Sequence, residues 1–173
     1  MKKYLPKQHN GFVILFTILI AAIIMVIGIG IYSIASRETV LSGTAREAQY
    51  AFYAADAGVE CALYAQSLEN AGTTVFATGA PAFDCGLNPV SITSGDGTFA
   101  TPYVFNVYVD ASKKTCAQVN VFEYTPVGGG GPVRRVIAQG YNICRPDGTP
   151  LTTNPILVER DLDASYNFAA PAL

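Results

Sequence analysis

Charged side chains are scarce in this chain of 173 residues, at 14% against about 25% in an average soluble domain. Tryptophan is absent, and the only histidine, His9, precedes a long apolar segment. With a single histidine, located ahead of that segment, the chain is poorly suited to His-based catalytic triads and His-rich metal sites. A pI of about 5.3 offers no basic surface for nucleic acid. We therefore expect neither an enzyme nor a nucleic-acid-binding protein, and we predict no catalytic residue, metal site or cofactor.

The apolar residues, half of the chain, are concentrated near its start, where residues 12–35 carry no charge. A run of 24 such residues is long enough to span a bilayer as a helix. The preceding segment carries Lys2, Lys3 and Lys7 but no acid, which predicts a cytoplasmic N-terminus and an exported remainder. A cleaved secretory signal is the alternative, although its apolar core would span only about 7–15 residues. We therefore expect insertion in the cytoplasmic membrane.

Helical periodicity continues beyond this run to about Leu68, and no proline occurs between Pro6 and Pro81. The large side chains expected to pack on the rest of the domain are Phe52, Val59 and Leu63. Apolar residues recur in steps of three and four, which predicts one stripe along the helix: Leu41, Ala45, Ala48, Phe52, Ala55, Val59 and Ala62. Because most of these residues are alanine, we expect the packing partner to approach closely.

Beyond the helix, frequent glycine, threonine and proline indicate loops and short strands. Four later segments have strand patterns: 103–109, 116–124, 133–144 and 156–166. The predicted fold class is α+β, with a long N-terminal helix packed on a C-terminal four-stranded antiparallel sheet. The predicted regions are a leader at 1–11, a membrane half of the helix at 12–35, an exported amphipathic half at 36–68, and a β domain at 69–173.

The four cysteines, Cys61, Cys85, Cys116 and Cys144, lack the C-x-x-C spacing of zinc and thioredoxin-type sites. Outside the cytoplasm they indicate two disulfides, for which three pairings are possible. Setting Cys116 opposite Cys144 in neighbouring strands places Val119 opposite Tyr141 and gives both strands an apolar face. This register predicts a Cys116–Cys144 bond, and it leaves Cys61 to pair with Cys85.

Two segments carry a resemblance to type IV pilins. Gly11-Phe-Val-Ile-Leu-Phe-Thr-Ile-Leu-Ile20, behind a lysine-bearing leader, resembles the class III signal of prepilins. The segment 46–60, with the pattern A-x-x-A-A-x-A-G-x-E, resembles the region that follows the membrane segment in PilX-type minor pilins. The resemblance covers residues 1–65. It implies a pilin-like fold, prepilin peptidase cleavage between Gly11 and Phe12, and N-methylation of Phe12.

The chain departs from the family pattern at two positions. Asn10 precedes the cleavage point, where the family often has a basic residue, and Phe16 stands where most major pilins carry a glutamate. In the family, that carboxylate neutralises the N-terminal amine of a neighbouring subunit inside the apolar filament core. An unpaired ammonium buried there costs several kcal/mol. Phe16 therefore predicts a subunit placed at the filament tip or in the initiating complex.

The resemblance implies a minor pilin or pseudopilin that primes or caps a type IV pilus-like filament and reaches the cell surface after assembly. The implied partners are other pilin subunits, the prepilin peptidase, the inner-membrane assembly platform and the membrane. Two alternatives stay open: a membrane-anchored exported binding module that does not assemble, and a major pilin.

Three charged groups outside these motifs have simpler interpretations. Asp56 and Glu60, four residues apart on the helix, are expected to be solvated surface charges rather than an acid–base pair. The acidic residues at 159–163 lack the D-x-D-x-D-G pattern of a calcium loop. Arg134 and Arg135 are expected to lie in a solvated hairpin.

Overall fold

The computed structural model describes residues 10–85, 88–110, 114–127, 131–146, 149–154 and 156–167. The first nine residues of the predicted leader lie outside these ranges. The chain divides into two compact units, Met1–Gly43 and Thr44–Leu173.

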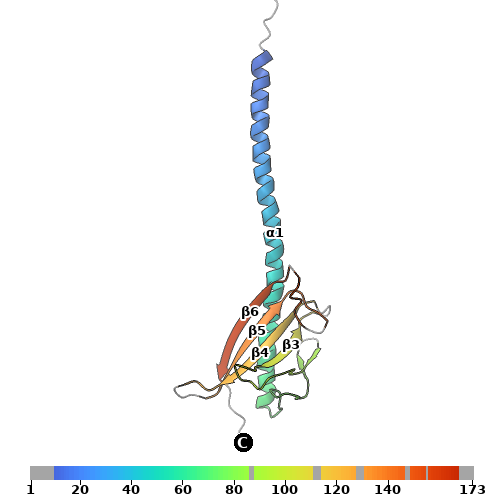
Figure 1. Ribbon diagram of the computed structural model, residues 1–173, viewed down its shortest axis with the longest axis vertical. Coiled ribbons are helices and arrows are strands. Elements are labelled where there is room, and N and C mark those ends of the chain that lie inside the picture. Colours follow the sequence, from blue (N-terminus) through green and yellow to red (C-terminus); the bar gives the residue numbers. More distant parts are fainter. Residues whose placement is uncertain are drawn as a thin grey trace, which may run out of the picture. The chain divides into compact units, whose positions relative to one another are not determined.

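One helix, α1 (Asn10–Asn70), takes up 61 residues and crosses the boundary between the units (Figure 1). The predicted long N-terminal helix is thereby confirmed. The helix is terminated by Gly72, two residues after its last residue, whose φ of 92° lies in the left-handed region. The Gly72 N–H donates to the carbonyl of Glu69, and the Thr73 N–H donates to that of Leu68. These two bonds form a Schellman cap, which satisfies carbonyl groups at the end of the helix.

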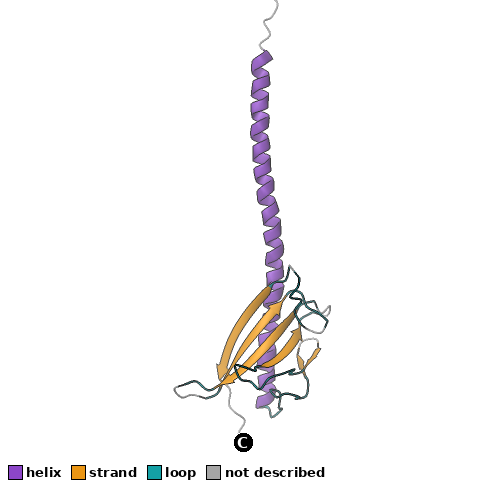
Figure 2. Ribbon diagram, viewed as in Figure 1, coloured by secondary structure: helices purple, strands orange, loops and turns teal. Residues whose placement is uncertain are grey.

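The second unit contains the predicted four-stranded antiparallel sheet, so the α+β fold class is confirmed (Figure 2). Its strands follow one another in chain order: β3 (Tyr103–Tyr108), β4 (Cys116–Tyr124), β5 (Val133–Tyr141) and β6 (Glu159–Asn167). Two short strands, β1 (Phe83–Cys85) and β2 (Asn88–Val90), form a separate hairpin. Strand β4 has its predicted bounds, whereas β5 ends three residues earlier than predicted and β6 begins three residues later.

The part of α1 within this unit packs on the sheet through small side chains. A Cβ atom on Gly58 would lie 2.9 Å from Val119 Cγ2 and 3.1 Å from Ala138 Cβ. The predicted contacts through Phe52 and Leu63 are wrong, because these side chains are 46% and 44% exposed. Ala55 and Ala62 of the predicted stripe are buried, as expected. The other small helix residues that are buried lie beside that stripe rather than in it: Ala51, Ala54, Gly58 and Ala65.

Large side chains of the core come mainly from the sheet and the loops around it, which compensates for the small residues of the helix. Phe105 packs edge-on against Phe83, with ring centroids 5.9 Å apart. The fully buried side chains with the largest volumes include Phe105, Val75, Val107, Val119, Val121 and Val136. The core therefore lies between the small-residue face of α1 and one face of the sheet.

The predicted register of β4 and β5 is wrong by three residues. Cys116 lies opposite Tyr141, and Val119 lies opposite Ala138. The observed register brings Gly140 against the helix, where a Cβ atom would lie 1.9 Å from the carbonyl oxygen of Ala51. Only a residue without a side chain fits there, and this constraint outweighs the alternation of apolar residues.

Both predicted disulfides are present despite that shift. Cys61 is bonded to Cys85 and Cys116 to Cys144, with Cα–Cα distances of 5.8 and 6.0 Å. Cys144 lies three residues beyond the end of β5, where it forms an isolated bridge with Pro150, so it reaches Cys116 without being its partner in the ladder. The described residues include no free cysteine.

Replacing Gly140 by alanine tests the close approach of helix and sheet. Gly140→Ala should lower the free energy of unfolding by about 3 kcal/mol or more, because the added methyl group meets backbone atoms that cannot rotate away. The measurement is urea unfolding of the full chain in detergent micelles, followed by circular dichroism.

Gly43→Ala is the matched control for this substitution. Gly43 lies within α1 with open space around it, and alanine there favours the helix by about 1 kcal/mol. Its stability should stay the same or rise. Equal stabilities for the two variants would contradict the packing described here.

Candidate functional site

The membrane-like segment of α1 exposes its apolar side chains on all sides. Large residues from Phe12 to Ile34 are exposed, Phe12 by 75% and Phe16 by 52%. The most apolar window of this helix has a mean hydropathy of 3.2, and none of it is buried. By length and composition the helix is able to cross a membrane.

The predicted processing junction lies at the start of this helix. Asn10 is the first residue of α1, and the ring of Phe12 stacks on that of Phe16, with centroids 6.4 Å apart. Thr17, the next polar residue, donates its hydroxyl hydrogen to the Ile14 carbonyl. The Phe16 ring, stacked on that of Phe12, thus stands where the resemblance implies a glutamate in a major pilin, and cleavage between Gly11 and Phe12 stays a prediction.

The pattern A-x-x-A-A-x-A-G-x-E occupies residues 51–60 and divides into two sets of residues. Ala51, Ala54, Ala55 and Gly58 are buried against the sheet, so packing alone accounts for these positions. Asp56 and Glu60 are exposed, as expected for solvated charges. The carboxylate of Glu60 is the part of the pattern that the fold of the unit does not use.

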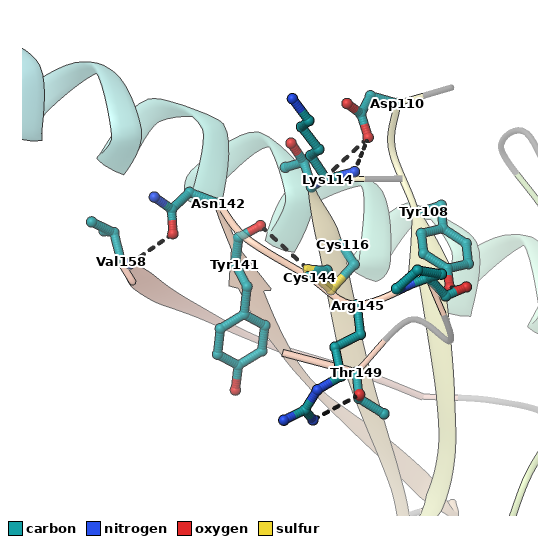
Figure 3. Close-up of a disulfide and its surroundings, with 12 residues drawn as sticks. Tyr108, Asp110, Lys114, Cys116, Tyr141, Asn142, Cys144, Arg145, Thr149 and Val158 are labelled. Carbon is teal, nitrogen blue, oxygen red and sulfur yellow. Dashed lines mark hydrogen bonds between the residues drawn. A yellow bond between two sulfur atoms is a disulfide. The ribbon is translucent and has the colours of Figure 1, made fainter. Parts of the chain in front are cut away.

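An open groove of about 880 Å³ lies beside the Cys116–Cys144 disulfide in the second unit (Figure 3). Its lining includes Tyr50 and Tyr53 from α1, Ile143 and Ile156, and the charged side chains of Asp110 and Lys114. Aromatic and apolar walls with a few charged groups are typical of sites that bind small molecules or peptides. The sequence analysis did not identify this groove, because it brings together four separate segments.

Hydrogen bonds of Asn142 hold one wall of the groove in place. The Asn142 side-chain amide donates to Glu47 Oε2 at 2.9 Å and to the Ile156 carbonyl at 3.1 Å. Its oxygen accepts the Val158 N–H at 2.7 Å, as Figure 3 shows. A single buried side chain therefore ties the helix, the end of β5 and the segment before β6 to one another.

Arg134 is buried, which corrects its predicted place in a solvated hairpin. Its guanidinium group forms ion pairs with Glu69 at the end of α1 and with Glu123 on β4. It also donates to the Gln66 side chain and lies over the Phe76 ring, 4.2 Å from the centroid. Arg134 therefore joins the last turns of the helix to the sheet.

The sequence contained a signal for this network. Arg134 alternates with Val136 and Ala138, which places all three on the face of β5 toward the helix. The predicted register placed Tyr141 opposite Val119 and so put the odd-numbered residues of β5 on the apolar face. That choice left Arg134 on the other face, where a solvated side chain is expected. A buried arginine also needs acidic partners, and those partners are distant in the sequence.

Arg135 and the acidic residues of β6 lie on the outer face of the sheet. The Arg135 Nε atom lies 3.0 Å from Asp163 Oδ1, and this bond lowers the pKa of the Asp163 carboxyl group. The Glu159 pKa is raised, first by partial burial and then by the neighbouring Asp161 carboxylate. In the ranges that the structure describes, no three His, Cys, Asp or Glu side chains are grouped to hold a metal ion.

No protein-family model, curated protein or solved structure matches this chain. The likeness to prepilins therefore rests on the two sequence segments quoted above and on the α+β architecture. The geometry provides an exposed apolar helix in the first unit. In the second unit it provides an open groove and, among the described residues, an outer strand, β6, that pairs with another strand on one side only.

Arg134 and its neighbour Arg135 allow a matched test of the buried network. Arg134→Met should lower the free energy of unfolding by about 3–5 kcal/mol, because Glu69 and Glu123 lose their shared cation. Arg135→Met removes an exposed, solvent-screened ion pair and should lower the free energy of unfolding far less than Arg134→Met does. Urea unfolding of the full chain measures both values. A loss for Arg134→Met no larger than that for Arg135→Met would refute the role assigned to the network.

Proposed function

We propose that this chain is a minor pilin-like subunit that primes or caps a type IV pilus-like filament after cleavage between Gly11 and Phe12. The observation that carries the proposal is a single uninterrupted helix. It begins at Asn10, beside the Gly-Phe junction, runs through an uncharged and mostly apolar segment, and continues into a disulfide-bonded α+β unit. The role is structural, so the proposal assigns no catalytic group.

The apolar segment gives the proposed mechanism its physical basis. Side chains of residues 12–35 are exposed, and transfer of apolar surface into water costs about 25 cal/mol per Å². Such a helix is stable in lipid, or among the apolar helices of other subunits in a filament core. Under the proposal, assembly exchanges the first environment for the second, and the exported unit stays in water.

Cleavage would change the electrostatics of the subunit. Loss of the leader removes three lysines, so the formal net charge of the chain falls from −2 to −5. The new amine at Phe12 then needs a compensating carboxylate once it leaves the bilayer. With Phe16 at the position of the family's glutamate, this subunit does not compensate the amine of a neighbour. A place at the tip or in the initiating complex avoids that cost.

A membrane-anchored binding module is the second candidate function. The groove of about 880 Å³ beside the Cys116–Cys144 disulfide supports it, since its size is that of a ligand site. In this case the apolar helix would remain in the membrane as a permanent anchor. Processing at Gly11 distinguishes the two candidates.

The first test is the N-terminus of the exported protein. Co-expression with a prepilin peptidase should yield a chain that begins at methylated Phe12, measured by mass spectrometry of the intact protein. Gly11→Val should block this cleavage, because a branched side chain then stands beside the scissile bond. Asn10→Lys, which supplies the basic residue common in the family, should leave cleavage intact or increase it. A chain that begins at Ser36, or that retains Met1, would rule out the filament proposal.

A second test addresses the place of the subunit in the filament. Quantitative mass spectrometry of purified filaments should find few copies of this chain, and Phe16→Glu should increase the number. Leu15→Glu is the matched control: it places the same charge one residue away, on a different face of the helix, and should not increase incorporation. If the unmodified chain is the dominant subunit, the minor-pilin assignment is wrong.

A further inference from the structure

We propose that the free edge of β6 binds an extended segment of a partner protein with basic side chains at alternate positions, which adds a fifth strand to the sheet. Strand β6 is the outermost strand of the four, drawn in red in Figure 1. This inference does not depend on filament assembly, because it concerns the second unit alone.

The edge of β6 is long and regular. All nine of its residues pair with β5 in an unbroken register, so no bulge interrupts the strand. It contains no proline, and its protection against indiscriminate pairing is the charge of Glu159, Arg160, Asp161 and Asp163. In the described part of the chain, no backbone–backbone hydrogen bond outside the β5 ladder involves β6, and the Glu159 carbonyl accepts a bond only from the side chain of its neighbour Arg160.

The phase of the ladder shows which backbone groups face outward. In antiparallel pairs, the N–H and C=O groups of successive residues point alternately to one side and the other. The Asn142 N–H donates to the Val158 carbonyl, so these opposite residues form a hydrogen-bonded pair. Every second pair along the ladder repeats this arrangement, so the even-numbered residues of β6 turn their N–H and C=O groups toward β5. Glu159, Asp161, Asp163 and Ser165 therefore turn their N–H and C=O groups toward the free edge.

The opposite edge of the sheet is already occupied. The Thr93 N–H donates to the Val104 carbonyl on β3, and the Val104 N–H donates to the Ser94 carbonyl. These bonds occupy the outward-facing N–H and C=O groups of Val104, so less of the β3 edge is available to a further strand. Of the two outer strands of this sheet, β6 is therefore the one with a continuous open edge over its described length.

The side chains of the edge indicate the chemistry of the partner. Glu159, Asp161 and Asp163 lie on one face of β6 at alternate positions. Asp163 already has a cation in Arg135. Glu159 and Asp161 instead lie beside each other, and their repulsion contributes to the raised pKa of Glu159. A fifth strand with lysine or arginine at alternate positions would place its cations next to these carboxylates and relieve the repulsion.

A second copy of the chain fits this edge poorly. If the β6 strands of two copies pair antiparallel along all nine residues, the middle residue of each strand, Asp163, lies opposite its own counterpart. It places the two Asp163 carboxylates opposite each other, an arrangement that destabilises a sheet. The charge pattern therefore favours a basic strand over self-association.

The test uses a synthetic peptide that alternates lysine with valine or threonine, and a matched peptide with glutamate in place of lysine. The full chain in detergent micelles should bind the lysine peptide, measured by fluorescence anisotropy. It should bind the glutamate peptide at least about tenfold more weakly, since three like-charged neighbours then oppose it. Hydrogen exchange followed by mass spectrometry should show slower exchange in the segment that contains β6.

Two variants at one position separate the backbone edge from the charge. Asp161→Pro removes an outward N–H without removing a bond to β5, so it should abolish peptide binding while the fold persists by circular dichroism. Asp161→Asn keeps the N–H and loses one charge, so binding should weaken about two- to fivefold. If Asp161→Pro does not fold, the comparison of the lysine and glutamate peptides on the unmodified chain still tests the proposal.

Three outcomes would overturn the proposal. The first is equal binding of the lysine and glutamate peptides. The second is protection by the lysine peptide that appears elsewhere than in β6. The third is protection of β6 that rises with protein concentration in the absence of peptide, which would identify a second copy as the occupant. None of these results bears on cleavage at Gly11, so failure here is distinguishable from failure of the proposed function.

Discussion

The second unit depends on the close approach of α1 to the sheet. At Gly140 the two backbones are so near that a methyl group would overlap the Ala51 carbonyl, and at Gly58 the helix lies against Val119 and Ala138. These contacts fix the register of β4 and β5, because sliding either strand would bring a side chain into that space. They also fix which face of the helix is buried. The small residues of the 51–60 pattern are explained by this one constraint.

Much of the architecture follows from local patterns in the sequence. The absence of proline from Pro6 to Pro81 predicts a long helix, and alternation predicts β4 with its observed bounds. The disulfide pairs were also predictable, since each cysteine bonds to its neighbour in sequence order. Such features depend on residues close together in the chain, where periodicity and spacing are informative.

The predictions that were wrong all depended on contacts between segments that are distant in the sequence. Phe52 and Leu63 fit a helical stripe at least as well as Ala51 and Ala54, and only the sheet's proximity selects the small residues. The β4–β5 register failed because β5 has apolar residues at even and odd positions alike, among them Val136, Ile137 and Tyr141, so its pattern did not identify the buried face. The error then misplaced Arg134, whose partner Glu69 is 65 residues away in sequence. Constraints between distant segments were beyond what these patterns contain.

Packing through alanine and glycine has a consequence for the outer face of the helix. Because small residues occupy the inner face, the large ones that helix α1 also carries are left exposed: Phe52, Tyr53, Leu63 and Tyr64. A monomeric soluble domain rarely exposes a large contiguous set of such residues. Between them lie Asp56 and Glu60, which add charge to the same exposed part of the helix. The constraint that determines the fold thus also leaves a mixed apolar and acidic surface on the outer face of the helix.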